Sequence, residues 1–246
     1  MNNPFSLSGK TILVTGASSG IGRGIAIVCA GMGAQVILTA RNTVRLQETL
    51  SALEGDGHSY IAADLTDAAQ RTALVEQVTT LHGVVHCAGV GSRVPCKMLS
   101  QADLDYVMKP NAEAPMLLQA QLLSEKKIKK QASVVFIASA AATMPSAGNA
   151  VYSASKAALV AYAKCLAQEL APRQIRVNCI SPTMVWTDLA LVGATVEQLD
   201  EAQKQYPLKR YGQPEDIANL AIYLLSDASA WMTGSNIEIT GGTQTL

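Results

Sequence analysis

Two residues in the second half of the sequence are spaced to move a proton together. Tyr152 and Lys156 are four residues apart in a stretch of helical periodicity, residues 151–170, so they share one face of the expected helix. A tyrosine hydroxyl ordinarily ionises only near pH ~10, but an ammonium group ~4 Å away stabilises the phenolate by up to ~4 kcal/mol at an effective dielectric of ~20. We therefore predict Tyr152 as a general acid/base that depends on Lys156.

A hydroxyl group stands at the end of the predicted strand before this helix. Ser139 follows the apolar run 134–138. At that edge of the sheet its hydroxyl can donate a hydrogen bond to a carbonyl oxygen that gains negative charge. The three side chains together are suited to reducing a ketone, or to oxidising a secondary alcohol, once a hydride carrier lies beside them.

A glycine-rich turn near the N-terminus predicts where that carrier binds. The motif TGASSGIG, residues 15–22, joins the first apolar run to a helical segment. Such turns also merely join strands to helices, but glycine in this context lets the backbone approach a pyrophosphate, and the helix N-terminus attracts its charge. The expected binding residues are Gly16, Ser18, Ser19, Gly20, Ile21 and Gly22.

The end of the second apolar run favours NADP(H) over NAD(H). The acidic residue that usually binds the ribose 2′-hydroxyl of NAD is replaced by Ala40. Arg41 and Asn42 follow, and a guanidinium group suits a 2′-phosphate, to which Ser18 adds a hydroxyl. Alternatively, Arg41 is a solvated arginine at the end of a strand and binds no phosphate.

These residues require a particular scaffold, a doubly wound parallel α/β sheet of the Rossmann type. Continuous apolar runs predict seven strands at residues 11–15, 35–39, 59–62, 83–87, 134–138, 176–180 and 236–239. Helical periodicity predicts helices at residues 20–32, 44–53, 68–79, 102–108, 112–123, 151–170, 196–205 and 214–225. We expect one domain, 1–246, with a substrate lid at 182–212.

Composition excludes several other classes of protein. Of 246 residues 49% are apolar, which is incompatible with disorder, and 19 basic residues balance 19 acidic ones, which gives no reason to expect nucleic acid or a membrane as partner. No targeting segment is evident, and an odd number of cysteines, five, indicates buried, reduced thiols in the cytoplasm. His82 and His86 are four apart, but Gly83 between them argues against a metal site.

The motifs together make the sequence similar to the short-chain dehydrogenase/reductase family over essentially its whole length. The resemblance rests on TGASSGIG, on Asp64, on Ala88-Gly89, on Asn111, on Ser139, on Tyr152 to Lys156, on Ser181-Pro182 and on the run from Gly212 to Gly242. It implies that Asn111 serves a proton-relay water, and it adds to the cofactor site Asp64, Leu65, Ala88, Gly89, Tyr152, Lys156, Pro182, Val185 and Thr187. The family's Asn-Ala-Gly is here Cys87-Ala88-Gly89, and its Pro-Gly is Pro182-Thr183.

The substrate and partners are less closely determined. Apolar lid residues favour an apolar or acyl-bearing ketone, or else pack the lid onto the body; they are Met184, Trp186, Leu189, Leu191 and Val192. The sequence most resembles 3-oxoacyl-carrier-protein reductases, in which Lys130 and Arg173 would dock an acidic carrier, although Lys126 to Lys130 also reads as a solvated helix end. Steroids, sugars and other small ketones are alternatives.

Small residues on the helix that carries Tyr152 allow close packing against a second subunit, and the resemblance implies a homotetramer, or at least a homodimer. The rival of a different class is a non-catalytic NADP-binding regulatory or partner-binding protein on the same fold. Such a protein would be expected to have lost a proton-transfer residue, whereas Asn111, Ser139, Tyr152 and Lys156 are all present.

Overall fold

Seven parallel strands form the centre of the molecule. The computed structural model describes residues 3–191 and 195–243. The strands pair in the order β3-β2-β1-β4-β5-β6-β7, with bounds β1 Thr11–Thr15, β2 Gln35–Ala40, β3 Ser59–Ala62, β4 Leu81–His86, β5 Ile128–Ile137, β6 Arg176–Pro182 and β7 Asn236–Ile239. The order reverses between β1 and β4, and ligands of such sheets bind beyond the carboxyl ends of the strands at this point.

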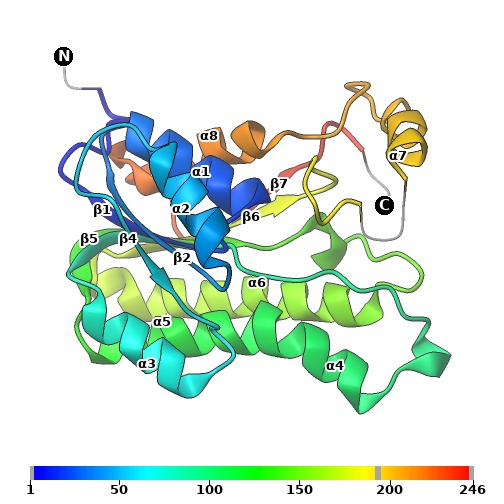
Figure 1. The fold of residues 1–246 in the computed structure, drawn as a ribbon, viewed down its shortest axis with the longest axis horizontal. Coiled ribbons are helices and arrows are strands. Elements are labelled where there is room, and N and C mark those ends of the chain that lie inside the picture. Colours follow the sequence, from blue (N-terminus) through cyan, green and yellow to red (C-terminus); the bar gives the residue numbers. More distant parts are fainter. Residues whose placement is uncertain (1–2, 192–194, 244–246) are drawn as a thin grey trace.

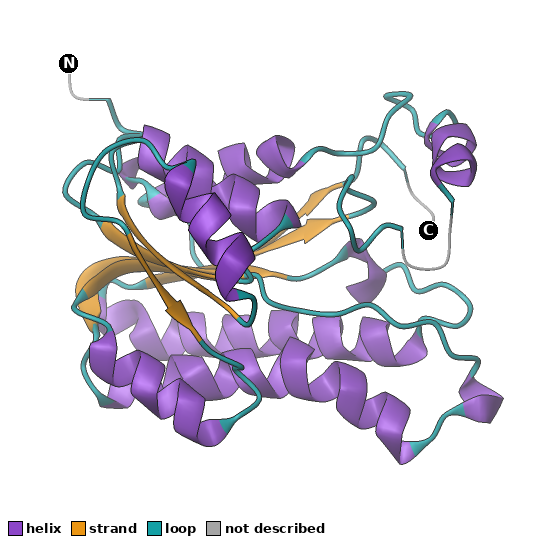
Figure 2. Ribbon diagram, viewed as in Figure 1, coloured by secondary structure: helices purple, strands orange, loops and turns teal. Residues whose placement is uncertain are grey.

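Helices cover both faces of the sheet (Figures 1 and 2). One layer contains α1 (Gly20–Gly31), α2 (Thr43–Ser51) and α8 (Pro214–Leu225), and the other contains α3 (Ala68–Gln77), α4 (Gln101–Met108), α5 (Ala114–Ser124) and α6 (Ala150–Leu170). A π-helical turn, Lys109–Glu113, joins α4 to α5. The short helix α7 (Val196–Gln203) stands beyond the end of the sheet, near β7. The predicted doubly wound architecture is confirmed.

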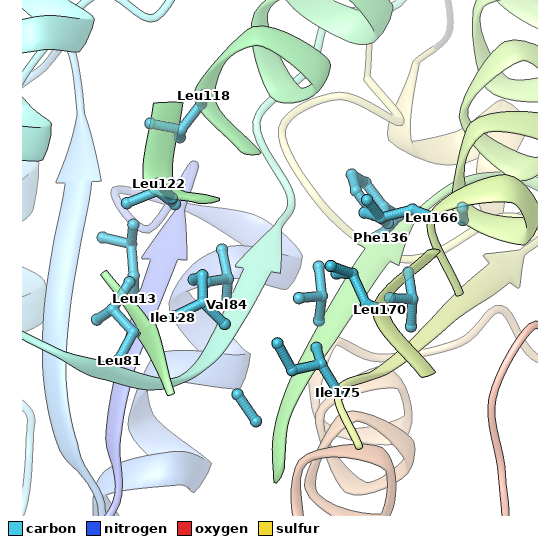
Figure 3. Packing of buried hydrophobic residues seen from close by; sticks show 14 of the residues in the cluster. Leu13, Leu81, Val84, Leu118, Leu122, Ile128, Phe136, Leu166, Leu170 and Ile175 are labelled. Atoms are coloured by element: carbon cyan, nitrogen blue, oxygen red, sulfur yellow. The ribbon is translucent and has the colours of Figure 1, made fainter. Parts of the chain in front are cut away.

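Strand side chains alternate between two apolar clusters, one on each face of the sheet. Leu13 of β1 and Phe136 of β5 pack with α5 and α6 in the first cluster, part of which is drawn in Figure 3. Val14 and Val135, one residue before or after them, pack with α1 and α8 in the second. Because both faces are covered, the middle of β1 and of β2 and residues 134–137 of β5 are apolar and show no polar alternation.

One strand begins earlier than its sequence suggests. The prediction for β5 starts at residue 134, whereas the strand starts at Ile128, which pairs with Leu81 across an irregularity in register. Lys129, Lys130 and Gln131 in this extension are exposed, so they lack the apolar signal of a buried strand. The expected helix end at Lys126 to Lys130 was therefore wrong for Lys129 and Lys130, which lie in a strand.

No helix within the described parts of the chain is long and apolar enough to cross a membrane.

Candidate active site

The predicted proton-transfer residues meet where β5 ends and α6 begins. Ser139 is the second residue after β5 and precedes a single 3₁₀ turn, while Tyr152 and Lys156 lie in the first two turns of α6. The Lys156 side chain is buried, its Nζ donates to the carbonyl oxygen of Ile137 at 3.0 Å, and it lies 5.8 Å from the centroid of the Tyr152 ring. A buried cation is thus held beside the phenol, as the helical spacing predicts.

Ser139 has its hydroxyl hydrogen available for a substrate. Its Oγ accepts a hydrogen bond from the backbone N–H of Ala141 at 3.1 Å. The oxygen is therefore already held as an acceptor, and the O–H bond is left to donate. That is the role predicted for this residue, a donor to an oxygen that gains charge.

Asn111 lies in the π-helical turn and is fully buried. Its Oδ1 accepts from the N–H of Val90 at 2.7 Å, and its Nδ2 donates to the oxygen of Val90 at 2.9 Å and to Oγ of Ser155 at 3.2 Å. The Ser155 hydroxyl donates in turn to the carbonyl oxygen of Tyr152 at 2.7 Å. The side chain therefore ties the loop after β4 to the catalytic helix, and the water-relay role stays a prediction.

Gly89, in the loop after β4, lies close to two of the predicted catalytic residues. A Cβ on Gly89 would lie 3.0 Å from Oδ1 of Asn111 and 3.5 Å from Nζ of Lys156. The first distance is tight and the second is an ordinary contact, so Gly89 lies next to the side chains of Asn111 and Lys156.

The glycine-rich loop after β1 packs against the same loop. Gly16 has a φ of 66°, and a Cβ on it would lie 2.9 Å from Cα of Ala88. Gly22 is equally constrained, because its Cβ would lie 2.3 Å from the oxygen of Gly16. Ser19 is the N-cap of α1, yet its side chain makes no capping hydrogen bond. The backbone here fits a pyrophosphate group, with the α1 N-terminus directed at it.

Cys87, which stands where the family pattern has asparagine, does not disturb the backbone hydrogen bonds after β4. The Oγ1 of Thr15 accepts from the N–H groups of Cys87 at 2.9 Å and of Ala88 at 3.1 Å. Burial raises the pKa of the Cys87 thiol to about 12 although the charge on Lys156 opposes this, so the thiol stays protonated and unreactive. The departure at Thr183 is also accommodated, since its N–H donates to the oxygen of Ile239 and its hydroxyl to that of Thr240.

A hollow lies at the carboxyl ends of β2 and β3, where the sequence predicts the adenosine part of the cofactor. It is lined by Arg41, Ala62, Ala63, Asp64 and Gln70. The N–H of Thr66, then its hydroxyl and the charge on Arg41, hold the pKa of Asp64 below its ordinary value, so the carboxylate is ionised at neutral pH. Asn42 accepts from the N–H of Arg45 at 3.0 Å and caps α2, which fixes the backbone after Arg41.

Two further residues, which were not predicted from the sequence, hold the backbone of Asp64 and Leu65. The Oε1 of Gln70 accepts from the N–H of Asp64 at 2.8 Å, and Nη1 of Arg71 donates to the oxygen of Leu65 at 2.7 Å. Arg71 is buried beside Leu74 and Val75 on α3. An arginine at one position of an apolar helical stripe is the signal that could have drawn attention to it.

The lid reaches back to the glycine-rich loop. Val185 is buried and bridges to Gly212, and a Cβ on Gly20, whose φ is 51°, would lie 3.0 Å from Cγ2 of Thr187. Ile21 and Pro182 lie at the start of α1 and at the end of β6. The structure thus brings the predicted cofactor residues to one sheet edge.

Two lid residues do not support the predicted apolar substrate surface. Met184 and Trp186 pack with Leu199, Tyr206 and Tyr211 in a small apolar cluster of the lid itself. The Trp186 Nε1 donates to Oε1 of Gln203 at 3.1 Å. Both side chains therefore pack within the lid, and not onto the body as the alternative had it, whereas Leu189 and Leu191 are exposed. Val192 lies outside the described residues.

The residues expected to dock a carrier protein lie away from the catalytic groups. Lys130 stands near the start of β5, nine residues and thus ~30 Å of strand before Ser139. Arg173 is engaged internally, since its Nη2 donates to the oxygen of Ile128 at 2.5 Å. Both residues belong to the amino edge of the sheet, opposite the candidate active site.

The cysteines are all unpaired, although not all are buried. Cys29 and Cys179 are buried, but Cys96 and Cys165 are exposed, contrary to expectation. Among the described residues no group of three or more His, Cys, Asp and Glu side chains is arranged to hold a metal ion.

Comparison with known proteins assigns the chain to a family. Residues 16–244 match the family model described as enoyl-(acyl carrier protein) reductase. The sequence is 33% identical over 244 residues to L-xylulose reductase of Caenorhabditis elegans, covering 97% of each chain. It is 31% identical over 243 residues to 3-oxoacyl-[acyl-carrier-protein] reductase of Rickettsia conorii, covering 97% of this chain and 98% of the other. The chain belongs to the short-chain dehydrogenase/reductase family.

Solved structures of this family agree with the fold. A dehydrogenase/reductase from Sinorhizobium meliloti superposes with a TM-score of 0.90 at 34% identity, covering 98% of both chains. A protein described as an NAD(P)-dependent gluconate 5-dehydrogenase from Beutenbergia cavernae, with NADP bound at low occupancy, gives 0.88 at 32% identity, covering 98% of both. The relatives of this short-chain dehydrogenase/reductase are named as reductases and dehydrogenases, and the chain is an oxidoreductase of their family.

Proposed function

We propose that this protein is an NADP(H)-dependent reductase that converts a ketone to a secondary alcohol with Tyr152 as general acid/base. The observation that carries the proposal is the buried Nζ of Lys156, held by Ile137 beside the Tyr152 ring. The close backbone contacts at Gly16 and Gly22, which leave no room for a Cβ, support a dinucleotide-binding turn next to these groups. When bound there, the nicotinamide supplies the hydride.

The proton chemistry is assigned to the protein. In the reduction, Tyr152 gives its phenolic proton to the substrate oxygen, and the positive charge of Lys156 stabilises the phenolate that remains. Ser139 donates a hydrogen bond to the same oxygen while negative charge builds on it. Asn111 holds the loop after β4 against α6 through its hydrogen bonds to Val90 and Ser155. In the oxidation of an alcohol the same groups act in reverse.

The preference for NADP(H) rests on Arg41. Its guanidinium group lines the hollow beside Asp64, where the acidic side chain of an NAD site is absent at Ala40. The NADP bound to the Beutenbergia cavernae relative supports the same cofactor.

For the substrate, the geometry gives more support to a small ketone than to a carrier-bound acyl group. Lys130 and Arg173 lie at the sheet edge opposite Ser139, which gives little support to a carrier docked on them that delivers its acyl group to this site. Trp186 and Met184, which were expected to contact an acyl chain, pack against other residues of the lid. The relative named L-xylulose reductase is consistent with a small polar ketone, and a 3-oxoacyl thioester is the second candidate, favoured by the Rickettsia conorii relative.

The test is consumption of NADPH across sugars, small cyclic ketones, steroids and 3-oxoacyl thioesters, with Tyr152→Phe as the matched variant. We expect turnover with at least one ketone and a loss of about 10²- to 10⁴-fold in Tyr152→Phe. A Tyr152→Phe protein that kept the wild-type rate would disprove the mechanism. NADPH binding without turnover of any ketone would favour the non-catalytic alternative.

We also propose that the protein assembles as a homotetramer, or at least a homodimer, in the cytoplasm. Ala154, Ala161 and Cys165 lie exposed along α6, and the neighbouring helices α4 and α5 expose Leu104, Tyr106 and Leu117. Small residues beside apolar ones suit close helix packing between two copies. Analytical ultracentrifugation at micromolar protein tests this, and a monomer would contradict it.

A further inference from the structure

Three consecutive residues of the predicted lid each contact a different segment at the edge of the proposed cofactor site. Thr187 lies against Gly20, and a Cβ on Gly91 would lie 3.1 Å from Cδ1 of Leu189. Between them, Oδ2 of Asp188 accepts a hydrogen bond from Nη1 of Arg45 at 2.9 Å. We call residues 187–189 the strap, because they connect the lid to the loops after β1 and β4 and to α2.

The ion pair of Asp188 and Arg45 joins residues 143 positions apart in the sequence. Within residues 3–191 and 195–243, no other ion pair connects the lid to α1, α2 or α3. Arg45 is placed by the same turn that carries the adenosine residues, since its N–H is bonded to Oδ1 of Asn42. The pair therefore links the lid to the segment that follows Arg41.

The position of this pair relative to the groove gives it a function. The proposed dinucleotide site extends from Arg41 and Asp64, past the glycine-rich loop, to Tyr152 and Lys156. The ion pair connects the segment after Arg41, at the adenosine end of that site, to the lid residues beside Gly20 of the glycine-rich loop. We propose that the Arg45–Asp188 ion pair is a clasp that keeps the strap over the bound dinucleotide and slows its release; this inference rests on the proposed function.

The exposure of the two side chains limits the size of the effect. Arg45 is 51% and Asp188 68% exposed, so their attraction is partly screened by water and further by salt. Exposed pairs of this kind change an equilibrium by about two- to five-fold. A clasp of this strength suits a cofactor that must leave after each turnover.

The experiment measures the release of NADPH and of NADH by stopped-flow fluorescence, with excess NADP⁺ or NAD⁺ as trap, in wild type, Arg45→Met and Asp188→Asn. Both variants should release each dinucleotide about two- to five-fold faster at low ionic strength, with no difference from wild type at about 1 M KCl. The double variant should be no faster than either single one, and exchange of the charges, Arg45→Asp with Asp188→Arg, should restore slow release.

The matched control is Asp105→Asn, which removes the similarly exposed Asp105–Lys109 pair within α4 and should leave release unchanged. The clasp is wrong if Asp188→Asn releases both dinucleotides at the wild-type rate. It is also wrong if Arg45→Met accelerates NADPH alone, because Arg45 would then act on the 2′-phosphate. A wild-type protein that binds neither dinucleotide would overturn the proposed function itself, and with it the clasp.

Discussion

The Nζ atom of Lys156 donates a hydrogen bond to the carbonyl oxygen of Ile137 at 3.0 Å, at the last residue of β5. The bond joins the catalytic helix to the strand that leads into Ser139. Lys156 is only 5% exposed, so little water screens its charge from the Tyr152 ring, 5.8 Å away. The sheet, and not only the spacing along the helix, therefore sets the position of the Lys156 ammonium group relative to the Tyr152 ring, the proposed general acid/base.

Replacement of this cation should abolish proton transfer without dismantling the fold. We expect Lys156→Met to lower kcat/KM for ketone reduction by at least about 10²-fold, because the phenolate left by Tyr152 loses its stabilising charge. Steady-state assays with NADPH measure this. Lys164→Met, which removes an exposed lysine of the same helix, is the matched control and should retain wild-type activity. Equal activities in the two variants would argue against a role for Lys156.

Asn111 should contribute to stability as well as to activity. Asn111→Ala leaves the N–H and carbonyl groups of Val90 and the hydroxyl of Ser155 without their partner. An unpartnered buried polar group costs about 1–3 kcal/mol, so the free energy of unfolding should fall by at least that amount in urea denaturation. Ser155→Ala, which removes one bond to Asn111 and the bond from Ser155 to the oxygen of Tyr152, should cost less. Wild-type stability in Asn111→Ala would show that the side chain is not a brace.

The sequence predicted the parts of this protein that have a local pattern. Strand and helix order followed from the apolar runs, and the roles of Gly16 and Gly22 followed from a turn that tolerates no Cβ. Tyr152 and Lys156 could be paired because helical spacing is a local rule. Each of these predictions depends on residues that are near one another in the chain.

Contacts between distant segments were not predictable in this way. The Arg45–Asp188 pair spans 143 residues, and nothing in either neighbourhood marks the partner. Trp186 and Met184 look like substrate contacts because they are apolar in a loop, but they pack against Leu199, Tyr206 and Tyr211 and are partly buried. The start of β5 was missed because Lys129 and Lys130 extend beyond the covered part of the sheet, where burial no longer selects apolar residues.

A methyl group on the first glycine of the loop after β1 should prevent cofactor binding. In Gly16→Ala the new Cβ would meet the backbone of Ala88 at 2.9 Å, at a φ of 66° that L side chains disfavour. Neither backbone segment can move aside without shifting β1 or the loop after β4. We expect weaker NADPH binding by fluorescence titration and a loss of stability above ~1 kcal/mol. Gly9→Ala, at a φ of 74° with open space around its Cβ, separates backbone strain from the clash and should spare NADPH binding.

The pH dependence of stability should contain a contribution from His86. Burial lowers the pKa of this histidine from 6.5 to about 4, against the opposing effect of its hydrogen bond to Gln119. Between these two pH values the unfolded chain therefore binds one more proton at His86 than the folded chain does. The stability that the neutral His86 contributes to the folded state is complete above pH 6.5 and is lost as the pH falls toward 4.

Urea denaturation of the wild type at several pH values between 7 and 4.5 should show this loss, which reaches about 3 kcal/mol when the full difference in pKa is counted. His86→Leu should lack this one-proton contribution while remaining folded at pH 7, because its neighbour Phe136 stacks on the ring from the apolar core. The same pH dependence in both proteins would assign the effect to other groups.

Cofactor preference should change on removal of one guanidinium group. Arg41 lines the hollow beside Asp64 and no acidic residue occupies position 40, so Arg41→Ala should weaken a contact that only the 2′-phosphate makes. A hydrogen bond to a charged group contributes ~1.5–3 kcal/mol, which predicts an increase of about 10- to 150-fold in the KM for NADPH and little change for NADH. Steady-state kinetics with both cofactors measure the ratio, with Arg23→Ala on α1 as a control that should leave it unaltered. A wild-type enzyme that already prefers NADH would contradict the assignment of Arg41, and an equal loss with both cofactors would place the guanidinium group on a part of the dinucleotide that the two share.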